Sequence, residues 1–326
     1  MIYIESTSYN PYYNLALEEF VFSSMDPKEP YFMLWQNENT IVVGKYQNTN
    51  EEINQEAVDA QHMNVVRRLS GGGTVYHDEG NLNFTFIVNK GNSPDFDFSI
   101  FVVPIIDALR SLGVDAEFSG RNDITINGLK ISGNSQYVKG GRVLHHGCIM
   151  LDSNLDKVKD ALNVKEAKFE SRSVKSVRSR ITTINANAPR KIIMQEFKDA
   201  IKKQVFKNED VKQHFLTPED ERAVEKLMRE KYETWEWNYG SNKKYSMRRE
   251  KKFDTGLVSV DMEVEHGIIK DIGISGDFFG SGEINELTSK IIGLALNEDL
   301  VDNLEKLCVE SYIHGVTAED LANLIR

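Results

Sequence analysis

Two arginines, a serine and three consecutive glycines follow one another at residues 67–73, with the sequence Arg-Arg-Leu-Ser-Gly-Gly-Gly. Three glycines leave one side of a turn without any Cβ, so its backbone N–H groups can contact an anion closely. A neighbouring guanidinium adds a fork of donors that fits a carboxylate or a phosphate. A lone Gly-Gly-Gly more often marks an ordinary hairpin turn beside solvated arginines. The adjacent arginines, Ser70 and the pair His77-Asp78 favour a ligand-binding loop here.

A lysine in a second polar segment offers another positive charge. Lys130 follows the turn Asn127-Gly128, which is typical of a two-residue β-hairpin, and its neighbours Leu129 and Ile131 are apolar. Alternate residues of a strand face opposite sides, so Lys130 points away from the apolar side. It is either a solvated surface charge or a point charge directed at a phosphate. Asp123, just before the turn, could orient Lys130, hold a metal ion or simply cap a turn.

The pair His77-Asp78 invites a hydrolase interpretation that its spacing does not support. His77 and Asp78 are adjacent on a predicted strand and face opposite sides, so we expect both to be structural. His145 and His146 alternate in the same way, and one of them could line a pocket. The chain has no cluster with zinc-ligand spacing, no P-loop and no Gly-x-Gly-x-x-Gly, so the common nucleotide folds are not indicated.

The spacing of apolar residues predicts an α/β fold around these segments. Asn10-Pro11 and the apolar stripe after it predict a helix over 11–24, and Gly113 should end a helix over 98–112. A strand, a glycine turn and a second strand should cover 63–89. The remaining predicted strands are 31–36, 40–44, 114–118, 124–126, 129–137 and 143–151, and the remaining helices are 50–61, 154–162, 191–204 and 219–232.

A charged stretch at 242–252 separates this region from a smaller one. We therefore predict two domains, 1–245 and 246–326. The second should be a small α+β module with a hairpin across His266-Gly267. Its predicted helices are 282–296, 299–308 and a last one that begins at the cap Thr317.

Composition limits the possible partners and location. The 326 residues carry a net charge of -11, which argues against nonspecific nucleic-acid binding or an anionic membrane surface. Two cysteines indicate a reducing compartment and no disulfide framework. Neither a signal peptide nor a membrane-spanning apolar run is recognisable. We expect a cytoplasmic protein, monomeric, with no nucleic-acid or membrane partner.

Taken together, the motifs resemble those of the lipoate–protein ligase family. Arg-Arg-x-Ser-Gly-Gly-Gly-x-Val-Tyr-His-Asp at 67–78 and Lys-Ile-Ser-Gly-Asn-Ser-Gln at 130–136 are similar to that family's two signature motifs. The resemblance spans about 10–185, and residues after about 245 more loosely resemble the family's C-terminal accessory domain. It implies a mixed-sheet catalytic domain like that of biotin and lipoate ligases, followed by a small α+β domain.

The resemblance implies a two-step reaction. Lipoate and ATP with Mg²⁺ give lipoyl-AMP and pyrophosphate, and the lipoyl group then passes to a specific lysine of a carrier domain. The implied carriers are the acyltransferase subunits of 2-oxoacid dehydrogenase complexes and the glycine cleavage H protein. A carboxylate that attacks the α-phosphorus builds up negative charge, which positioned cations and backbone N–H groups can stabilise.

The family's functional residues carry over onto matching positions. Lys130 is the expected catalytic residue, because it matches the lysine that touches both the lipoate carboxylate and the phosphate. The implied contacts to ATP or the adenylate are Arg68, Gly73, Thr74, Val75, Tyr76, Asn83, Asp123 and Lys130. The implied contacts to lipoate are Ser70, Gly71, Gly72, Lys130 and His146, and Asp123 is also the implied metal contact. The Lys/Arg-rich stretch 165–183 matches a mobile loop that orders over the adenylate, through Ser176, Val177, Arg178 and Ser179. Its part 165–180 is also our candidate patch for carrier docking.

Three alternatives stay open. Related acyltransferases of this fold move octanoyl or lipoyl groups without ATP through a cysteine nucleophile, and Cys148 could play that part; a small buried cysteine is the simpler interpretation. Biotin–protein ligases share the fold but have a different glycine motif. A protein that binds lipoate or its carrier without catalysis is the third.

Overall fold

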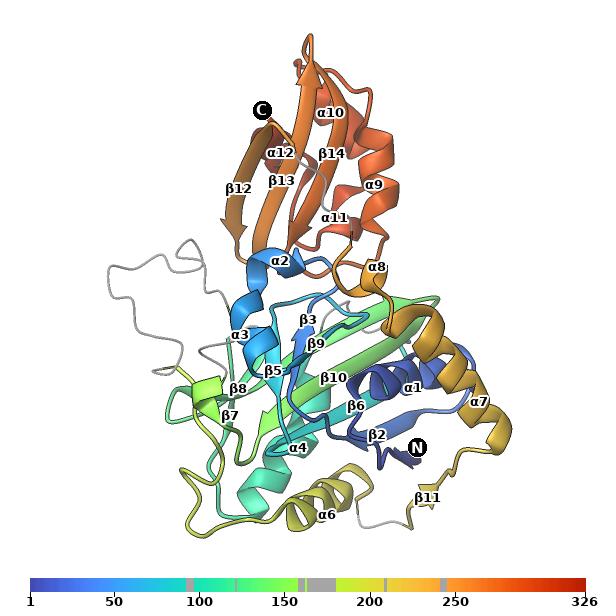
Figure 1. The fold of residues 1–326 in the computed structure, drawn as a ribbon, viewed down its shortest axis with the longest axis vertical. Helices are drawn as coiled ribbons and strands as arrows, with labels where there is room; N and C mark the ends of the chain where they lie inside the picture. Colours follow the sequence, from blue (N-terminus) through green and yellow to red (C-terminus); the bar gives the residue numbers. More distant parts are fainter. Residues whose placement is uncertain (92–96, 121, 158–161, 163–179, 208–209, 241–244) are drawn as a thin grey trace.

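The computed structural model describes residues 1–326 with the exception of 92–96, 121, 158–161, 163–179, 208–209 and 241–244. An N-terminal α/β body occupies the lower part of Figure 1, and a smaller domain built from the C-terminal residues stands above it. The body contains a large mixed sheet, so the predicted mixed-sheet fold with an α+β C-terminal domain is confirmed. None of the helices in the described ranges is both long and apolar enough to cross a membrane.

Eight strands form the large sheet. In spatial order they are β11 (Lys212–Gln213), β1 (Ile2–Glu5), β2 (Tyr31–Trp35), β6 (Asn81–Asn89), β10 (Arg142–Met150), β9 (Leu129–Lys139), β8 (Asp123–Ile126) and β7 (Glu117–Ser119). Strand β1 runs parallel to β2 and β11, and the other neighbours are antiparallel. The predicted hairpin at Asn127-Gly128 is confirmed, and both residues have positive φ, 53° and 75°.

The glycine loop belongs to a separate, three-stranded sheet. Strand β3 (Thr40–Val43) lies between β4 (Asn64–Arg67), to which it is parallel, and β5 (Val75–His77), to which it is antiparallel. The predicted strand before the loop is present as β4, but the region predicted as one strand after it contains β5 and, in the large sheet, β6. Neither of these pairs with β4 as in a hairpin. The loop at 68–74 instead passes across the end of β3, where the N–H of Arg68 donates to the carbonyl of Val43 (3.0 Å).

Helices cover both faces of the large sheet. Helices α4 (Ser99–Ser111) and α6 (Met194–Val205) pack on the face that carries Phe32 and Phe86. Helices α1 (Pro11–Ser23) and α7 (Pro218–Leu227) pack on the opposite face, which carries Met33 and Ile87. Successive strand residues thus enter different cores, as the period of two requires. Helix α1 begins at the predicted cap, where the Asn10 side chain accepts from the N–H groups of Tyr12 and Tyr13.

Two predicted helices of the N-terminal body are interrupted. The helix predicted over 50–61 is two short ones, α2 (Thr49–Glu52) and α3 (Gln55–Ala60), because buried Ile53 is extended and the Asn54 side chain caps α3. The helix predicted over 219–232 continues from α7 as a π-helical turn, Met228–Tyr232. Residues 158–161 of the predicted helix 154–162 and residues 165–179 of the predicted loop 165–183 lie outside the described residues.

The C-terminal domain has its own sheet and its own apolar core. Its strands are β12 (Met247–Phe253), β13 (Gly256–Glu265) and β14 (Ile268–Gly276), and its helices are α9 (Ile284–Ile291), α10 (Leu300–Glu305), α11 (Val309–Tyr312) and α12 (Ala318–Ile325). The predicted hairpin at His266-Gly267 and the capping box of Thr317 with Asp320 are confirmed. The charged stretch 248–252, which we interpreted only as a boundary, is instead part of the edge strand β12. Exposed charges suit an edge, because they discourage pairing with another chain.

Arg67 holds the glycine-loop sheet to the segments around it. Its buried guanidinium donates from Nη1 to the carbonyls of Gly44 (2.8 Å) and Gln47 (2.7 Å), and from Nη2 to Thr49 Oγ1 (2.6 Å). Its Nε donates to the carbonyl of Trp237 (2.9 Å), in the short helix α8 (Trp235–Asn238). Burial lowers the pKa of Arg67 to about 10, so the group stays charged at neutral pH. Of the two arginines in the motif, Arg67 is the one that binds the turn at residues 44–47 and helix α8 instead of the glycine loop.

Arg67→Met should lower the free energy of unfolding by about 3 kcal/mol, because several buried acceptors lose a charged donor at once. Urea unfolding followed by tryptophan fluorescence measures this change. Arg229→Met is the matched control: Arg229 pairs with Glu225 at the surface, where its side chain is 60% exposed. That control should change stability by less than about 0.5 kcal/mol. Equal losses for the two variants would contradict the role of Arg67.

Candidate functional site

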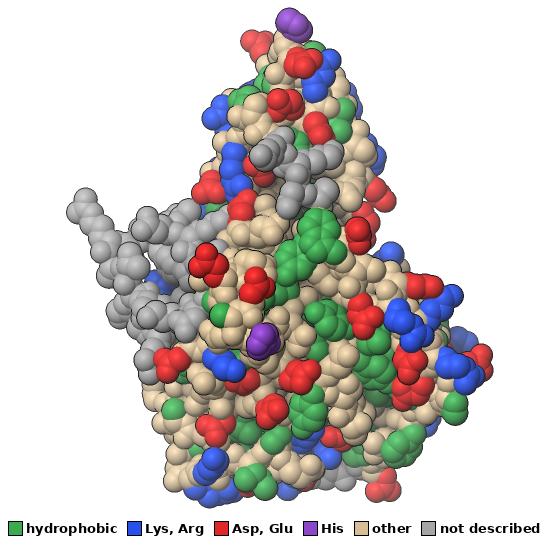
Figure 2. Space-filling model, viewed as in Figure 1, with side chains coloured by type: hydrophobic (Ala, Val, Ile, Leu, Met, Phe, Trp, Pro, Cys, Tyr) green, Lys and Arg blue, Asp and Glu red, His purple; other side chains and the backbone are tan. Residues whose placement is uncertain are grey.

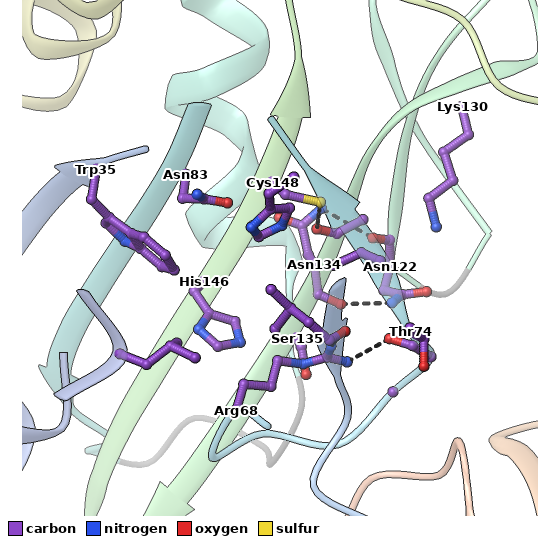
Figure 3. A pocket seen from close by; sticks show the side chains of 18 residues that line it. Trp35, Arg68, Thr74, Asn83, Asn122, Lys130, Asn134, Ser135, His146 and Cys148 are labelled. Carbon is purple, nitrogen blue, oxygen red and sulfur yellow. Dashed lines mark hydrogen bonds between the residues drawn. The ribbon is translucent and has the colours of Figure 1, made fainter. Parts of the chain in front are cut away.

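A cavity of about 100 Å³ lies where the glycine loop faces the large sheet (Figure 3). Its wall combines the glycine loop with side chains from α1, β2, β3, β6, β9 and β10. In Figure 3, Lys130 and Thr74 lie on one side of the site, and Trp35 and His146 lie on the other. The two sides differ in character, since Lys130 and Thr74 are charged and polar, whereas Trp35 packs in one apolar core with Leu15 and Val42, which also line the cavity.

The structure brings most of the predicted residues into this one wall. The predicted residues that line the cavity are Arg68, Gly72, Gly73, Thr74, Val75, Asn83, Lys130 and His146. Ser70, Gly71 and Asp123 lie directly behind it, where they contact wall residues. Tyr76 is turned away, with its ring in a small apolar core and its hydroxyl on Asn39 Oδ1 (2.8 Å). Ser176, Val177, Arg178 and Ser179 lie outside the described residues.

Lys130 enters the cavity as a partly exposed cation with one carboxylate beside it. Its Nζ lies 2.7 Å from Asp123 Oδ1, and the two side chains are 34% and 33% exposed. Its backbone is fixed on both sides, since its N–H donates to the carbonyl of Arg180 (2.8 Å) and its carbonyl accepts from Thr182 (2.9 Å). The ammonium is therefore aimed but still accessible, which allows a ligand anion to share it.

Asp123 is placed to orient Lys130 rather than to hold a metal. Its carboxylate is occupied by the ammonium group, which repels a cation. Within the described residues, no three His, Cys, Asp or Glu side chains gather closely enough to hold a metal ion. The described residues thus lack the cluster of carboxylates that would hold Mg²⁺ directly.

Arg68 shapes the glycine loop from inside. Its Nη2 donates to the carbonyls of Gly71 (2.6 Å) and Gly73 (2.8 Å), and its Nε donates to Ser70 Oγ (3.1 Å). Burial lowers its pKa to about 10, so it remains a cation. Most of its donors are thus engaged with the loop, and only Nη1, which is 3.3 Å from the carbonyl of Val42, is loosely held. Arg68 can contribute its charge to a ligand while it positions the loop.

The loop itself leaves backbone facing open space. Gly72 has φ +86°, a conformation that other residues adopt only with strain. A Cβ on Gly73 would meet no heavy atom within 4 Å. No group in the described part of the chain accepts a hydrogen bond from the N–H of Gly73. This is the arrangement expected of a backbone that receives an anion.

A buried hydrogen-bonded chain supports the other side of the cavity. Ser70 Oγ lies 2.6 Å from His146 Nε2, and His146 Nδ1 lies 2.9 Å from Glu18 Oε1. The same Glu18 oxygen accepts from Thr85 Oγ1 (2.7 Å), which accepts from Trp35 Nε1 (2.9 Å). Ser70 is 1% exposed and lies outside the cavity wall, so this Ser–His–Glu order does not make it a nucleophile. The chain holds His146 and Trp35 in place.

Sequence reasoning missed Glu18 in this chain, although a signal was present. Glu18 follows Leu15 by three residues and precedes Val21 by three, so it stands on the apolar stripe of its helix. A carboxylate there must be buried, and buried charges have partners. Asn83 and Thr85 gave a similar signal, because they alternate with apolar residues and lie on the site face of β6.

His77, which we predicted to be structural, lies in the cavity wall. Its Nδ1 is paired with the amide of Asn37 (3.3 Å), while Nε2 has no partner among the described residues. Burial, together with the charge of Arg68, lowers the pKa of His77 to about 3, so the ring is neutral. With Nδ1 accepting, the ring proton belongs on Nε2. Asp78 does act as scaffold, because it accepts from the N–H groups of Gly80 and Asn154.

Two further polar atoms of the wall are buried without a protein partner in the described ranges, Asn83 Nδ2 and Asn134 Oδ1. Unpaired buried polar atoms are costly, and a ligand can satisfy them. His145, by contrast, faces the other side of β10, where it stacks on Phe101 at 4.5 Å. Of the two adjacent histidines, His146 is the one that reaches the site.

Cys148 also lies in the wall, with its Sγ 3.8 Å from the carbonyl of Gly133. Burial raises the pKa of the Cys148 thiol, so the thiol form dominates at neutral pH. Since the thiolate is the nucleophile, this environment does not activate the residue.

Comparisons with known proteins agree on one family. The family description "Lipoyl protein ligase A/B catalytic domain" matches residues 10–206, and "Bacterial lipoate protein ligase C-terminus" matches residues 242–325. The chain is 40% identical to lipoate-protein ligase LplJ of Bacillus subtilis, over 100% of both chains. It is 42% identical to lipoate–protein ligase 1 of Staphylococcus aureus, over 97% of both. The structure of P. falciparum LipL1 in complex with lipoate has a TM-score of 0.81 at 24% identity, covers 100% of this chain and 98% of its own, and shows the same fold.

The lowered pKa of His77 makes stability depend on pH. Between about pH 3 and the ordinary value of 6.5, the unfolded chain binds a proton at this residue and the folded chain does not. Stability therefore rises with pH across this window and falls on acidification. When the pH falls from 7.5 to 5, the free energy of unfolding should decrease by about 2 kcal/mol less in His77→Gln than in the unmodified protein. Urea unfolding at each pH measures this difference. Parallel pH profiles for the two proteins would contradict the buried neutral ring.

Proposed function

Because the chain belongs to the lipoate–protein ligase family, we propose that it activates lipoate with ATP to lipoyl-AMP and transfers the lipoyl group to a carrier lysine. The adenylating route is supported by one observation: two anion-binding groups face the same cavity. Lys130 supplies an accessible ammonium group, and the loop at Gly73 supplies open backbone. A carboxylate and a phosphate must meet between such groups for an acyl adenylate to form.

The reaction places negative charge where these groups can oppose it. As the lipoate carboxylate attacks the α-phosphorus, pyrophosphate leaves and a mixed anhydride forms. Lys130 bridges the carboxylate and the α-phosphate, while the positive charge of Arg68 lies behind the glycine loop. These groups are held before the substrates bind, so little reorganisation accompanies the reaction. Neutral His77 can donate a hydrogen bond from Nε2 without adding charge.

We assign the two sides of the cavity to the two substrates. Arg68, Gly73, Thr74 and Val75 contact the nucleotide on the Lys130 side. Asn83, the strand partner of Trp35, contacts it from the other side. Gly72 and His146, with the apolar side chains of Leu15, Trp35 and Val42, surround the acyl chain. Ser70 acts through His146, and Asp123 acts through Lys130. Mg²⁺ accompanies ATP and is held mainly by phosphate oxygens and water, as is usual for this ion.

The transfer step needs a carrier protein and involves both predicted domains, 1–245 and 246–326. We propose carriers of the lipoyl-domain type, from 2-oxoacid dehydrogenase complexes or the glycine cleavage system. Acidic side chains are spread over both the body and the C-terminal domain on the face seen in Figure 2. Docking of an acidic carrier therefore requires a local basic patch, for which we retain residues 165–180 as the candidate.

A pyrophosphate-release assay tests the adenylating route. With ATP and Mg²⁺ present, lipoate should cause pyrophosphate release and biotin should not. Octanoate tests how strictly the apolar side of the cavity selects the acyl chain of the substrate. Lys130→Ala should lower lipoate-dependent release at least about 100-fold, because it removes the cation at the reacting phosphate. The circular dichroism spectrum should be unchanged, since Lys130 is partly exposed. Near-normal release by this variant, or no release by the unmodified protein, would refute the proposal.

Matched variants separate the ammonium charge from its orientation. Lys191 is paired with Asp152 outside the cavity wall, and Lys191→Ala should keep full activity. Asp123→Asn keeps the shape of the side chain but removes the charge that orients Lys130. Its activity should therefore lie between that of Lys130→Ala and that of Lys191→Ala.

The ATP-free acyltransferase alternative depends on Cys148. Cys148→Ser should leave lipoate-dependent pyrophosphate release within about threefold of the unmodified protein, because a thiol with a raised pKa is not needed for adenylation. Transfer of a lipoyl group from a thioester or carrier donor, measured without ATP, is the complementary assay. ATP-independent transfer that the serine substitution abolishes would favour the acyltransferase.

A further inference from the structure

The C-terminal domain reaches the glycine loop through one short segment, residues 276–283. The carbonyl of Phe278 accepts a hydrogen bond from the N–H of Gly72 (3.2 Å). The same oxygen lies so close to Gly71 that no side chain fits there. A Cβ on Gly72 would lie 3.2 Å from the Phe279 ring. The first and second of the three consecutive glycines, Gly71 and Gly72, are thus in contact with another domain.

The segment is held firmly on its own side. The N–H of His314 donates to the carbonyl of Phe279 (2.8 Å), and the rings of Phe278 and Phe279 are 0% and 1% exposed. Gly280 packs against the backbone of Tyr312 too closely for any Cβ. The C-terminal domain therefore presents residues 276–283 as a rigid projection.

The N-terminal body grips this projection beside the loop. The Tyr46 ring stacks on Phe278 with centroids 4.8 Å apart and planes 12° apart, and its hydroxyl donates to the carbonyl of Gly280 (3.0 Å). Lys45 Nζ lies 3.0 Å from Glu283 Oε1. The Phe279 ring also contacts the Phe98 ring, at 5.5 Å between centroids. These contacts between the two domains lie next to the glycine loop and not on a distant surface.

This contact decides which backbone donors of the loop remain for a ligand. The N–H of Gly72 is given to Phe278, so an anion must use the positions that follow, beginning with Gly73. Gly72 is held at φ +86° between the Arg68 guanidinium and the Phe279 ring. Glycines lose more conformational freedom on ordering than other residues. Without the clamp, a ligand would have to order the loop as it bound.

We propose that Phe278 and Phe279 are positioning residues of the reaction, through which the C-terminal domain fixes Gly71–Gly73 and directs the free loop backbone at the ligand. The proposal rests on the proposed function for its kinetic consequence, but the clamp itself concerns only the protein. Phe278 belongs to the apolar core of its domain, whereas Phe279 contacts the loop and Phe98, so Phe279 is the residue to change.

Two measurements on the full chain test the proposal. In Phe279→Ala, amide hydrogen exchange over residues 70–76 should accelerate, and KM for ATP or lipoate should rise about tenfold, the cost of ordering roughly one more residue. The rate at saturating substrate should change less than KM. Phe279→Leu should recover most of both effects because it refills the contact. Phe215→Ala is the control, since Phe215 is 75% exposed and lies outside the cavity wall.

A charge exchange tests the clamp without replacing any of its aromatic residues. Lys45→Glu and Glu283→Lys should each accelerate exchange over 70–76 and raise KM, while the double variant should restore both toward the unmodified values. Unchanged exchange in Phe279→Ala, or faster exchange with unchanged KM, would overturn the positioning role. If the unmodified protein shows no lipoate-dependent pyrophosphate release, the proposed function fails instead, and the exchange data still decide whether the clamp exists.

Discussion

The site depends on keeping a loop without side chains in one conformation. Gly71, Gly72 and Gly73 cannot hold themselves, because they have no side chains with which to pack and a wide choice of φ. The protein supports them from two sides. Arg68 binds the carbonyls of Gly71 and Gly73 from within, and Phe278 binds the N–H of Gly72 from the C-terminal domain. Glycine lets the loop approach an anion closely, but it also gives the backbone conformational freedom. The loop can use the first property only because its neighbours restrict the second.

The adjacent arginines divide this task because strand residues alternate. Arg67 and Arg68 point to opposite sides at the end of β4, so one binds the turn at Gly44–Gln47 and the other binds the glycine loop. Burying a guanidinium is costly, and carbonyl acceptors offset that cost when they fill its fork of donors. Buried Glu18 is satisfied on the same principle, by His146 and Thr85. The buried charges of Arg67 and Glu18 next to the site are therefore satisfied by the protein itself.

Much of this arrangement could be predicted from local sequence, and the remainder required knowledge of spatial neighbours. The hairpin at Asn127-Gly128 and the cap at Asn10 are local devices, so both predictions were confirmed. Apolar alternation identified the strands around the glycine loop but not their partner, because β3 comes from an earlier part of the chain. The charged strand β12 escaped detection because an exposed edge needs backbone pairing and no apolar face. The clamp of residues 276–283 joins segments about 200 positions apart, and no local pattern reports such a contact.

The difference between Lys130 and the arginines shows how the site can be both rigid and responsive. Arg68 is buried and largely committed to the protein, so its charge is constant and its position fixed. Lys130 is about one-third exposed and has Asp123 at 2.7 Å, in surroundings wet enough for the pair to open. An exposed ion pair contributes at most about 1 kcal/mol, so an incoming carboxylate or phosphate can share the ammonium at little cost. Lysine suits this position because its flexible stem lets a point charge follow a reacting anion, whereas the planar fork of arginine suits the fixed one.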